Sequence, residues 1–247
     1  LHASIVKKGF LEDDYIGSAL VDVYAKCRSI ADARSVFNEL SSQNVVSWTA
    51  LIAGYVQYDH AEDALNCFNR MRNEGFSPDA RTFVCILKAC GNMGEMEKAQ
   101  HIHGEIARIG LLETDVFVGT ALVDMYIKAG FLAKAQEVFD KLPAPNVVSW
   151  NAMINGCVNL GSFEDALRIF CQMQDNGIKP DISTLVCVLK ACSGLSALNE
   201  GMMVHSHFLE SGFKFDEYVG SALIEIYSKC GSLKDASRLF AIFPSKE

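Results

Sequence analysis

Two copies of one nine-residue stretch organise this chain: Asn44-Val45-Val46-Ser47-Trp48-Thr49-Ala50-Leu51-Ile52 and, 102 residues later, Asn146-Val147-Val148-Ser149-Trp150-Asn151-Ala152-Met153-Ile154. Seven of the nine positions are identical, and both tryptophans of the chain lie inside the two copies. Chance is a poor explanation for so close a match. The chain is therefore built by internal duplication.

The same offset relates repeats along the whole chain, and they are of three kinds. Short repeats of 31 residues span 14–44, 116–146 and 217–247. Standard repeats of 35 residues contain the tryptophans and span 45–79 and 147–181. Long repeats of 36 and 35 residues span 80–115 and 182–216, and residues 1–13 match the end of a long repeat. These predicted repeats form a single array with no residue left for a linker.

Each repeat is predicted to form two short helices. In the first standard repeat, one helical face carries Leu51, Ile52, Tyr55 and Val56, and a second helix carries Ala64, Leu65, Phe68 and Met71. Gly75 and Gly177 are expected to end the second helices in the left-handed conformation. A hairpin of two such helices exposes an apolar flank that the next hairpin covers. The predicted fold is all-α, a right-handed α-solenoid superhelix of stacked helix-turn-helix hairpins.

Composition and charge exclude several classes of protein. The net charge of −8 argues against a sequence-blind polyanion binder, whose affinity comes from Lys and Arg displacing counterions. No run approaches the roughly 18 apolar residues of a membrane span, so no membrane partner is expected. The first residues, Leu1-His2-Ala3-Ser4, include neither an initiator Met nor a targeting pattern. We expect the chain to be an internal fragment with any transit peptide upstream.

Cysteine and histidine patterns predict neither disulfides nor a metal site. The nine cysteines are an odd number without a Cys-x-x-Cys pair, which favours free, mostly buried thiols in a reducing compartment. The best metal candidate combines His101 and His103 with His205 and His207, but His2, His103 and His205 occupy one repeat position. They are therefore expected to lie about one superperiod apart, without a shared zinc ion. No cofactor is expected.

Trp48 and Trp150 have two interpretations, as base-stacking platforms or as side chains buried between hairpins. We favour burial, because each tryptophan alternates with polar neighbours.

The motifs of the standard repeats resemble the pentatricopeptide repeat family. They read Val-Val-Ser-Trp-(Thr/Asn)-Ala-(Leu/Met)-Ile, then Ala-Leu-x-x-Phe-x-x-Met, then Gly-(Phe/Ile)-x-Pro-Asp. The resemblance covers the whole chain. The alternating lengths, with Tyr-Ala-Lys-Cys at 24–27 and Tyr-Ser-Lys-Cys at 227–230, are similar to the plant subfamily with long and short repeats. Members of that subfamily commonly specify sites of C-to-U RNA editing in organellar transcripts.

The resemblance implies binding of single-stranded RNA, one base per repeat, through the fifth and the last residue of each repeat. The implied base-recognition pairs are Ser18 with Asn44 for adenine, Thr49 with Asp79 for guanine, Thr120 with Asn146 for adenine, and Asn151 with Asp181 for uracil. Val84 and Val186 of the long repeats cannot hydrogen-bond a base, and the last pair, Ser221 with Glu247, is left unassigned. The predicted target is 5′-A-G-n-A-U-n-3′.

Two further sets of residues are implied by the resemblance. The second residue of each repeat is expected to stack between bases, a role that falls to Tyr15, Val46, Phe117, Val148 and Tyr218. Arg81 and Ser183 fill this place in the long repeats. A lysine that recurs in each short repeat is expected to contact phosphate: Lys26, Lys128 and Lys229.

The predicted function is therefore sequence-specific RNA binding in mRNA processing, located in a mitochondrion or a chloroplast. Expected partners are single-stranded RNA, editing cofactor proteins or a deaminase, and the chain is expected to be a monomer. No catalytic motif is present, and the His-x-Glu and Pro-Cys-x-x-Cys signature of a deaminase is missing from this segment. A deaminase domain would have to lie beyond its C-terminus. The alternative is a protein-interaction scaffold of the tetratricopeptide type, which also stacks helix hairpins of about 34 residues.

Overall fold

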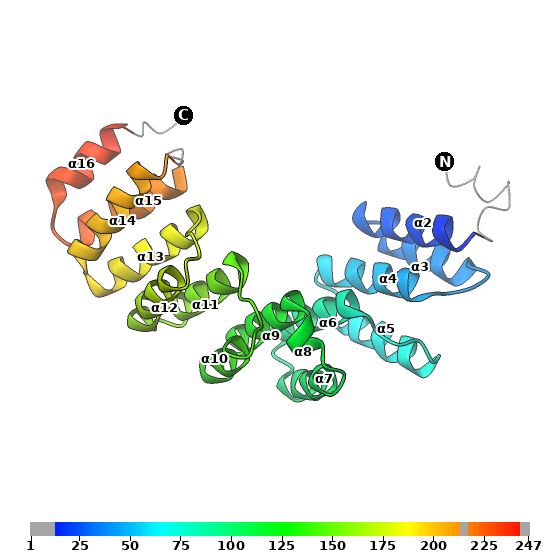
Figure 1. Cartoon of the computed structure of the whole chain (residues 1–247). Coiled ribbons are helices and arrows are strands. Elements are labelled where there is room, and N and C mark those ends of the chain that lie inside the picture. The colour runs from blue at the N-terminus through cyan, green and yellow to red at the C-terminus, as the bar shows by residue number, and fades with distance from the viewer. Residues whose placement is uncertain (1–12, 213–216, 243–247) are drawn as a thin grey trace. The chain divides into compact units, whose positions relative to one another are not determined.

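The computed structural model describes residues 13–212 and 217–242, and within these ranges the chain forms fifteen helices and no strand (Figure 1). The prediction of an all-α fold is confirmed. The chain divides into two compact units, one ending at Ala129 and the other beginning at Gly130. This boundary falls inside the predicted short repeat 116–146.

The first unit contains eight described helices. They are α2 (Asp14–Lys26), α3 (Ile30–Glu39), α4 (Val45–Gln57), α5 (Ala61–Asn73), α6 (Ala80–Met93), α7 (Met96–Arg108), α8 (Leu111–Thr114) and α9 (Val116–Lys128). The first helices of the repeats pack side by side in the order α2, α4, α6 and α9. The second helices α3 and α5 each pack against the first helix of their own repeat and against that of the next one.

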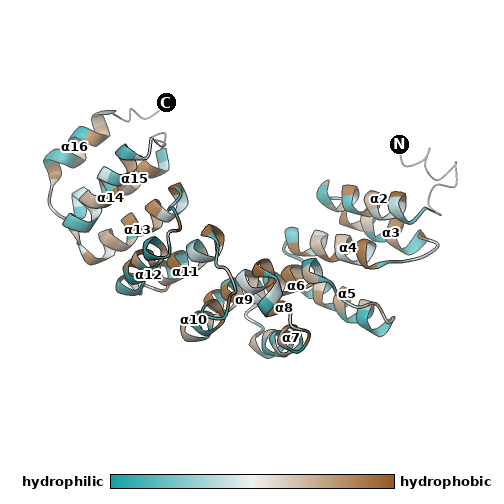
Figure 2. Cartoon of the chain, in the orientation of Figure 1, coloured by the Kyte–Doolittle hydropathy of each residue, from teal (hydrophilic) through white to brown (hydrophobic). Residues whose placement is uncertain are grey.

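The second unit contains seven described helices and repeats this arrangement. They are α10 (Leu132–Phe139), α11 (Val147–Asn159), α12 (Phe163–Asp175), α13 (Ile182–Leu195), α14 (Leu198–Glu210), α15 (Glu217–Lys229) and α16 (Leu233–Ile242). First helices α11, α13 and α15 form one row, and α12 and α14 pack between successive members of it. Polar and apolar stretches alternate along most helices, as expected when one face of each is buried (Figure 2).

The beginnings of the first helices have a common local cause. Each described N-cap of a first helix is an aspartate or asparagine whose side chain accepts one or two backbone N–H groups of the first turn. Such a side chain satisfies donors that the helix itself leaves unpaired. The second helices with described caps have no side-chain cap of this kind. First helices therefore begin at a sharply specified residue.

The ends of the second helices match the sequence-based expectation in the standard repeats. Gly75 has φ = 86° and Gly177 has φ = 72°, in the left-handed region that glycine adopts without strain. The N–H of the residue after each glycine donates back to the helix, from Phe76 to the Met71 carbonyl at 3.1 Å and from Ile178 to the Met173 carbonyl at 3.1 Å. The prediction for both glycines is confirmed.

The two tryptophans lie in the core of their units. Trp48 is 0% exposed, with its ring centroid 4.5 Å from that of Phe37, and Trp150 lies 4.7 Å from Phe139 in the same edge-on geometry. Each therefore joins the second helix of a short repeat to the first helix of the next standard repeat. The interpretation of Trp48 and Trp150 as buried packing residues is confirmed.

The first long repeat differs from the predicted pair of helices. Residues 111–114 form the additional one-turn helix α8, which begins after Gly110 at φ = 72° and buries Leu112. The Asp115 N–H closes this turn on the Leu111 carbonyl at 2.9 Å. The extra turn carries the chain from the end of α7 to the aspartate that caps α9. The two-helix prediction was wrong for this repeat because a left-handed glycine followed by an apolar pair can start a new turn.

All nine cysteines are free, and five of them are buried. Burial raises the pKa of Cys67 to about 12 and those of Cys90, Cys157 and Cys192 to about 11. These side chains are therefore protonated at neutral pH, as thiols that pack rather than react. Within residues 13–212 and 217–242, no group of three or more acidic, histidine or cysteine side chains is arranged to hold a metal ion. None of the described helices is long and apolar enough to cross a membrane.

Candidate nucleic-acid interface

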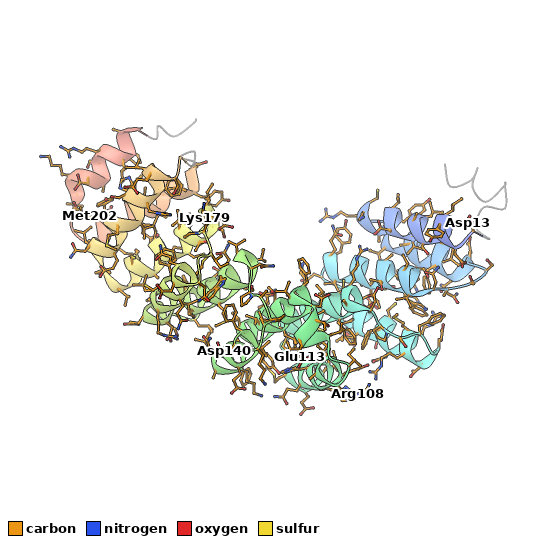
Figure 3. The ribbon with its side chains drawn as sticks, viewed as in Figure 1. Asp13, Arg108, Glu113, Asp140, Lys179 and Met202 are labelled. Carbon is orange, nitrogen blue, oxygen red and sulfur yellow. The ribbon has the colours of Figure 1, made fainter. Side chains whose placement is uncertain are left out.

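The predicted stacking side chains are exposed at the start of five first helices. Tyr15 is 89% exposed and Tyr218 is 80% exposed, and Val46, Phe117 and Val148 are also exposed. They occupy the second residue of α2, α4, α9, α11 and α15. Their recurrence at one repeat position is what the predicted stacking role requires. Figure 3 shows the side chains of both units, with Asp13 labelled at the N-cap of α2.

A pocket of about 460 Å³ in the first unit brings several of the predicted residues together. It is lined by Tyr15, Ser18, Asn44, Val46 and Arg81, with Asp14, Ala19, Asp22 and Ala50 completing its wall. The pocket thus brings the first predicted base-recognition pair together with the predicted stacking residues Tyr15 and Val46. Arg81 comes from α6, two repeats further along the chain, and forms no ion pair with any described residue. Its repeat position was noted in the sequence, but its place beside this pair was missed.

The geometry of the first pair shows how an asparagine cap is oriented. Asn44 Oδ1 accepts the Ser47 N–H at 2.9 Å and lies 3.3 Å from Ser18 Oγ. A backbone N–H can be accepted only by the amide oxygen, so capping fixes which way the amide faces. The nitrogen Nδ2, a donor, is the atom left for another partner. Ser18 Oγ donates to the Asp14 carbonyl at 2.7 Å and is almost fully buried.

The second pair, Thr49 and Asp79, is connected through a third residue. Asp79 Oδ1 accepts both the backbone N–H and the hydroxyl of Thr82, each at 2.7 Å. The oxygens Thr49 Oγ1 and Thr82 Oγ1 lie 2.7 Å apart. Thr49 is only 2% exposed, whereas Asp79 is exposed. The atom of this pair available to a ligand is therefore the second carboxylate oxygen of Asp79, an acceptor.

The corresponding pair in the second unit, Asn151 and Asp181, is in direct contact. Asn151 Nδ2 donates to Asp181 Oδ1 at 3.0 Å, and the Thr184 hydroxyl lies 2.6 Å from Asn151 Oδ1 and 3.0 Å from Asp181 Oδ1. Burial by itself would raise the pKa of Asp181, but hydrogen bonds from Thr184 and Asn151 outweigh it and hold the pKa below its usual value. Asp181 is therefore an ionised acceptor at neutral pH.

The remaining predicted base-recognition residues are placed individually. Thr120 and Asn146 belong to different compact units, and each is described within its own. Thr120 Oγ1 donates to the Val116 carbonyl at 2.7 Å, and Asn146 caps α11 through the N–H groups of Val148 and Ser149. In the last repeat, Ser221 Oγ donates to the Glu217 carbonyl at 2.7 Å, while residue 247 lies outside the described residues.

The three predicted phosphate lysines are engaged within their own helices. Lys26 pairs with Asp22 at 2.6 Å, Lys128 with Asp124 at 2.9 Å, and Lys229 with Glu225 at 2.7 Å, each four residues apart. All three ion pairs are partly exposed and therefore weak. A phosphate at these lysines would compete with a neighbouring carboxylate, which reduces the attraction expected from each lysine alone.

Thr82 and Thr184 are the residues that sequence reasoning missed. Both are fully buried, and both occupy the third position after an aspartate cap. The signal was readable as Asp-x-x-Thr at 79–82 and 181–184, which is the spacing of a side chain that reaches back to the cap. Their contact with the fifth residue of the preceding repeat was not readable, because it crosses between helices.

Protein-family models match most of these repeats. A model described as the PPR repeat family matches residues 43–92 and 145–194, and a PPR repeat model matches 18–45, 81–111, 120–144 and 221–244. A pentatricopeptide repeat-containing protein of Arabidopsis thaliana is 38% identical over 247 residues, covering 100% of this chain and 36% of that protein. Another, named chloroplastic, is 36% identical over 246 residues, covering 100% of this chain and 40% of that protein.

The fold is also similar to that of solved structures. The crystal structure of the pentatricopeptide repeat protein PPR10 in complex with an 18-nt psaJ RNA element matches with a TM-score of 0.63 at 18% identity. The match covers 91% of this chain and 37% of that one. This chain spans well under half the length of the relatives it matches. Because the family models cover more than half of its residues, the chain belongs to the pentatricopeptide repeat family.

Proposed function

We propose that this chain binds single-stranded RNA one base per repeat, at the starts of the first helices, where Tyr15, Val46 and Phe117 are exposed in the first unit and Val148 and Tyr218 in the second. The observation that carries the proposal is that the last residue of each repeat whose cap is described uses one polar atom to cap a helix and leaves a second polar atom for a ligand. One of its polar atoms caps the next first helix, as Asn44 Oδ1 and Asp79 Oδ1 do. The cap thereby fixes which polar atom remains for a ligand, and for Asn44 the pocket that it lines also contains the predicted stacking residues Tyr15 and Val46.

The chemistry of that second atom supports a choice of base. An asparagine cap leaves Nδ2, a donor, which matches the ring-nitrogen acceptor on the pairing edge of adenine. An ionised aspartate cap leaves an acceptor, which matches the N–H groups on the pairing edges of guanine and uracil. The order Asn44, Asp79, Asn146 and Asp181 then supports the target 5′-A-G-n-A-U-n-3′, with the N-terminal repeats at the 5′ side.

The biological role we propose is to specify a site of C-to-U editing or of other processing in an organellar transcript. Relatives named chloroplastic and mitochondrial support an organellar location. The alternation of short, standard and long repeats supports the plant subfamily with long and short repeats. The predicted array of repeats would bind RNA as a monomer, and editing itself would come from a partner protein or a deaminase domain outside this segment.

A binding titration tests the proposal. The chain is titrated into 5′-A-G-n-A-U-n-3′ RNA, into the same RNA with the four specified bases permuted, and into the corresponding duplex. The proposal expects the first RNA to bind at least tenfold more tightly than the permuted one, because a mismatched edge leaves a polar group unpaired at a cost of about 1–3 kcal/mol. Equal affinity for all three, or no binding, would instead favour a protein-interaction scaffold.

A further inference from the structure

Two buried threonines join the polar pairs of the standard repeats across the boundary to the next repeat. Thr82 and Thr184 are each 0% exposed and are the third residues of the long repeats. Thr82 Oγ1 lies 2.7 Å from both Thr49 Oγ1 and Asp79 Oδ1. Thr184 Oγ1 lies 2.6 Å from Asn151 Oδ1 and 3.0 Å from Asp181 Oδ1. In both compact units, a buried threonine hydroxyl thus lies between the fifth and the last residue of the preceding standard repeat.

The single hydroxyl proton of each threonine fixes which group donates and which accepts among Thr49, Thr82 and Asp79. A threonine hydroxyl has one proton, and in Thr82 it goes to the carboxylate of Asp79, which can only accept when ionised. Thr82 Oγ1 must then accept the proton of Thr49. The chain of donors runs from Thr49 through Thr82 to Asp79. A hydroxyl that is itself hydrogen-bonded in this way is a stronger donor to the next group.

At the junction between the first short and the first standard repeat, a hydroxyl occupies the same position, but Ser47 Oγ makes no hydrogen bond to the fifth residue Ser18 among the described residues. Ser47 Oγ donates to the Asn44 carbonyl at 2.9 Å, and Ser149 Oγ donates to the Asn146 carbonyl at 2.8 Å. The serine hydroxyls are therefore used locally at the cap. Ser18, the fifth residue of that short repeat, donates to the Asp14 carbonyl at 2.7 Å and lies 3.3 Å from Asn44 Oδ1, so it meets the cap directly and not through the serine. Thr120 donates to the Val116 carbonyl of its own helix.

We propose that Thr82 and Thr184 are positioning residues that set the base choice of the standard repeat before them. This inference rests on the proposed function. With two hydrogen bonds from Thr82, Asp79 Oδ1 cannot rotate away from the helix start, so its other oxygen is held toward the base. In the second unit Thr184 orients the amide of Asn151, whose nitrogen donates to Asp181. Through the threonine, the identity of the fifth residue thus influences how the last residue meets the base edge.

The test uses Thr82→Val, which keeps the shape and removes the hydroxyl, and Thr82→Ser, which keeps the hydroxyl. Each variant is titrated with RNAs that differ only at the second base (G or A) or only at the fifth base (U or C). Thr82→Val is expected to reduce the preference for G over A about tenfold, the worth of a hydrogen bond to a charged group, and to leave the fifth-base preference unchanged. Thr82→Ser should restore the G preference.

Thr184→Val is the matched variant in the other unit and should reduce only the preference for U over C. Melting curves of all variants establish that each is folded at the titration temperature. If wild type prefers G over A and Thr82→Val does so equally, the positioning role is wrong while the proposed function stands. A uniform loss of affinity on every RNA, not restored by serine, would also overturn it. If the wild-type chain prefers neither G over A at the second base nor U over C at the fifth base, both proposals fail.

Discussion

At the scale of single residues, the cap aspartates and asparagines are the side chains to which we assign two roles, one observed at the helix start and one proposed toward RNA. Their inward atom stabilises a helix start, and their outward atom differs between the two residue types. Removing an N-cap side chain costs about 1 kcal/mol of stability, whereas exchanging Asp for Asn keeps an oxygen for the cap. The Asp–Asn exchange therefore separates the two roles.

Asp79→Asn should move the preference at the second base from guanine to adenine. Oδ1 remains to accept the Thr82 N–H, so the outward oxygen is replaced by the donor Nδ2. The measurement is a binding titration against RNAs that differ only at that base. The ranking of guanine and adenine should invert or converge, with the other positions unaffected. Uniform weakening on all RNAs would mean that Asp79 only supports the fold.

His205 should make stability depend on pH. Its Nδ1 lies 3.0 Å from the Tyr227 hydroxyl, and burial lowers the pKa of the imidazole in the folded chain. The unfolded chain therefore binds a proton first as the pH falls. The stability contributed by neutral His205 is present at neutral pH and is lost as the pH drops through the ordinary histidine range toward the lower folded pKa.

Denaturant unfolding between about pH 7.5 and about pH 5 measures this loss, since that interval spans histidine titration. His205→Gln, which can still hydrogen-bond Tyr227, should flatten the dependence of the free energy of unfolding on pH. His101→Gln changes an exposed histidine on α7 and serves as the control. Equal pH dependence in wild type and His205→Gln would contradict the assignment.

At the scale of helices, close packing of neighbouring first helices requires a small residue. Gly54 lies in α4, and a Cβ built there would be 2.7 Å from the Cβ of Ala25 in α2. Real side chains do not approach so closely, so the two helices would have to separate. Gly104 lies in α7, where an added Cβ would meet nothing within 4 Å. The two glycines form a matched pair.

Gly54→Ala should lower the melting temperature, because the strain between α2 and α4 exceeds the gain in helix propensity. Gly104→Ala should raise it, since alanine is favoured over glycine in a helix by up to about 1 kcal/mol. Thermal unfolding followed by circular dichroism gives both values under the same conditions. Stabilisation by both substitutions would show that α2 and α4 separate at little cost.

At the scale of the whole molecule, the proposed binding of RNA by an acidic chain depends on which of its cations are free to meet phosphate. The net charge is −8, and the lysines at the ends of α2, α9 and α15 are paired with carboxylates. Arg81 lines the pocket of Ser18 and Asn44, the first predicted base-recognition pair, without an ion-pair partner among the described residues. We therefore expect it to contribute more to the electrostatic attraction of RNA than its single charge suggests.

Arg81→Ser should reduce the salt dependence of RNA binding. Serine occupies this position naturally in the second long repeat, as Ser183. Loss of one phosphate contact lowers the slope of log affinity against log salt by about 0.7 for single strands. The control is Arg108→Ser, which changes the last residue of α7, the second helix of the same long repeat; Arg108 is labelled in Figure 3. This control should leave the slope unchanged. Equal slopes for wild type and Arg81→Ser would remove Arg81 from the interface.

What could be read from the sequence depends on residues that lie close together along the chain. Apolar periodicity, the caps and the left-handed Gly75 and Gly177 act within one or two helical turns, so helix order and helix starts followed from sequence alone. The buried state of Trp48 and Trp150 also followed, because their polar neighbours alternate with them. The turn of α8 did not follow, since its single buried leucine was a weak signal beside the predicted hairpin.

The tertiary structure decided which polar atoms meet. Thr49 and Thr82 are 33 residues apart, and their hydroxyls approach only because α4 and α6 pack side by side. Arg81 reaches the pocket of Ser18 and Asn44 for the same reason. Pairing rules of a family name the residues that face a ligand, but a hydrogen bond needs an approach within about 3 Å. That approach is set by the packing of whole helices, which no local pattern specifies.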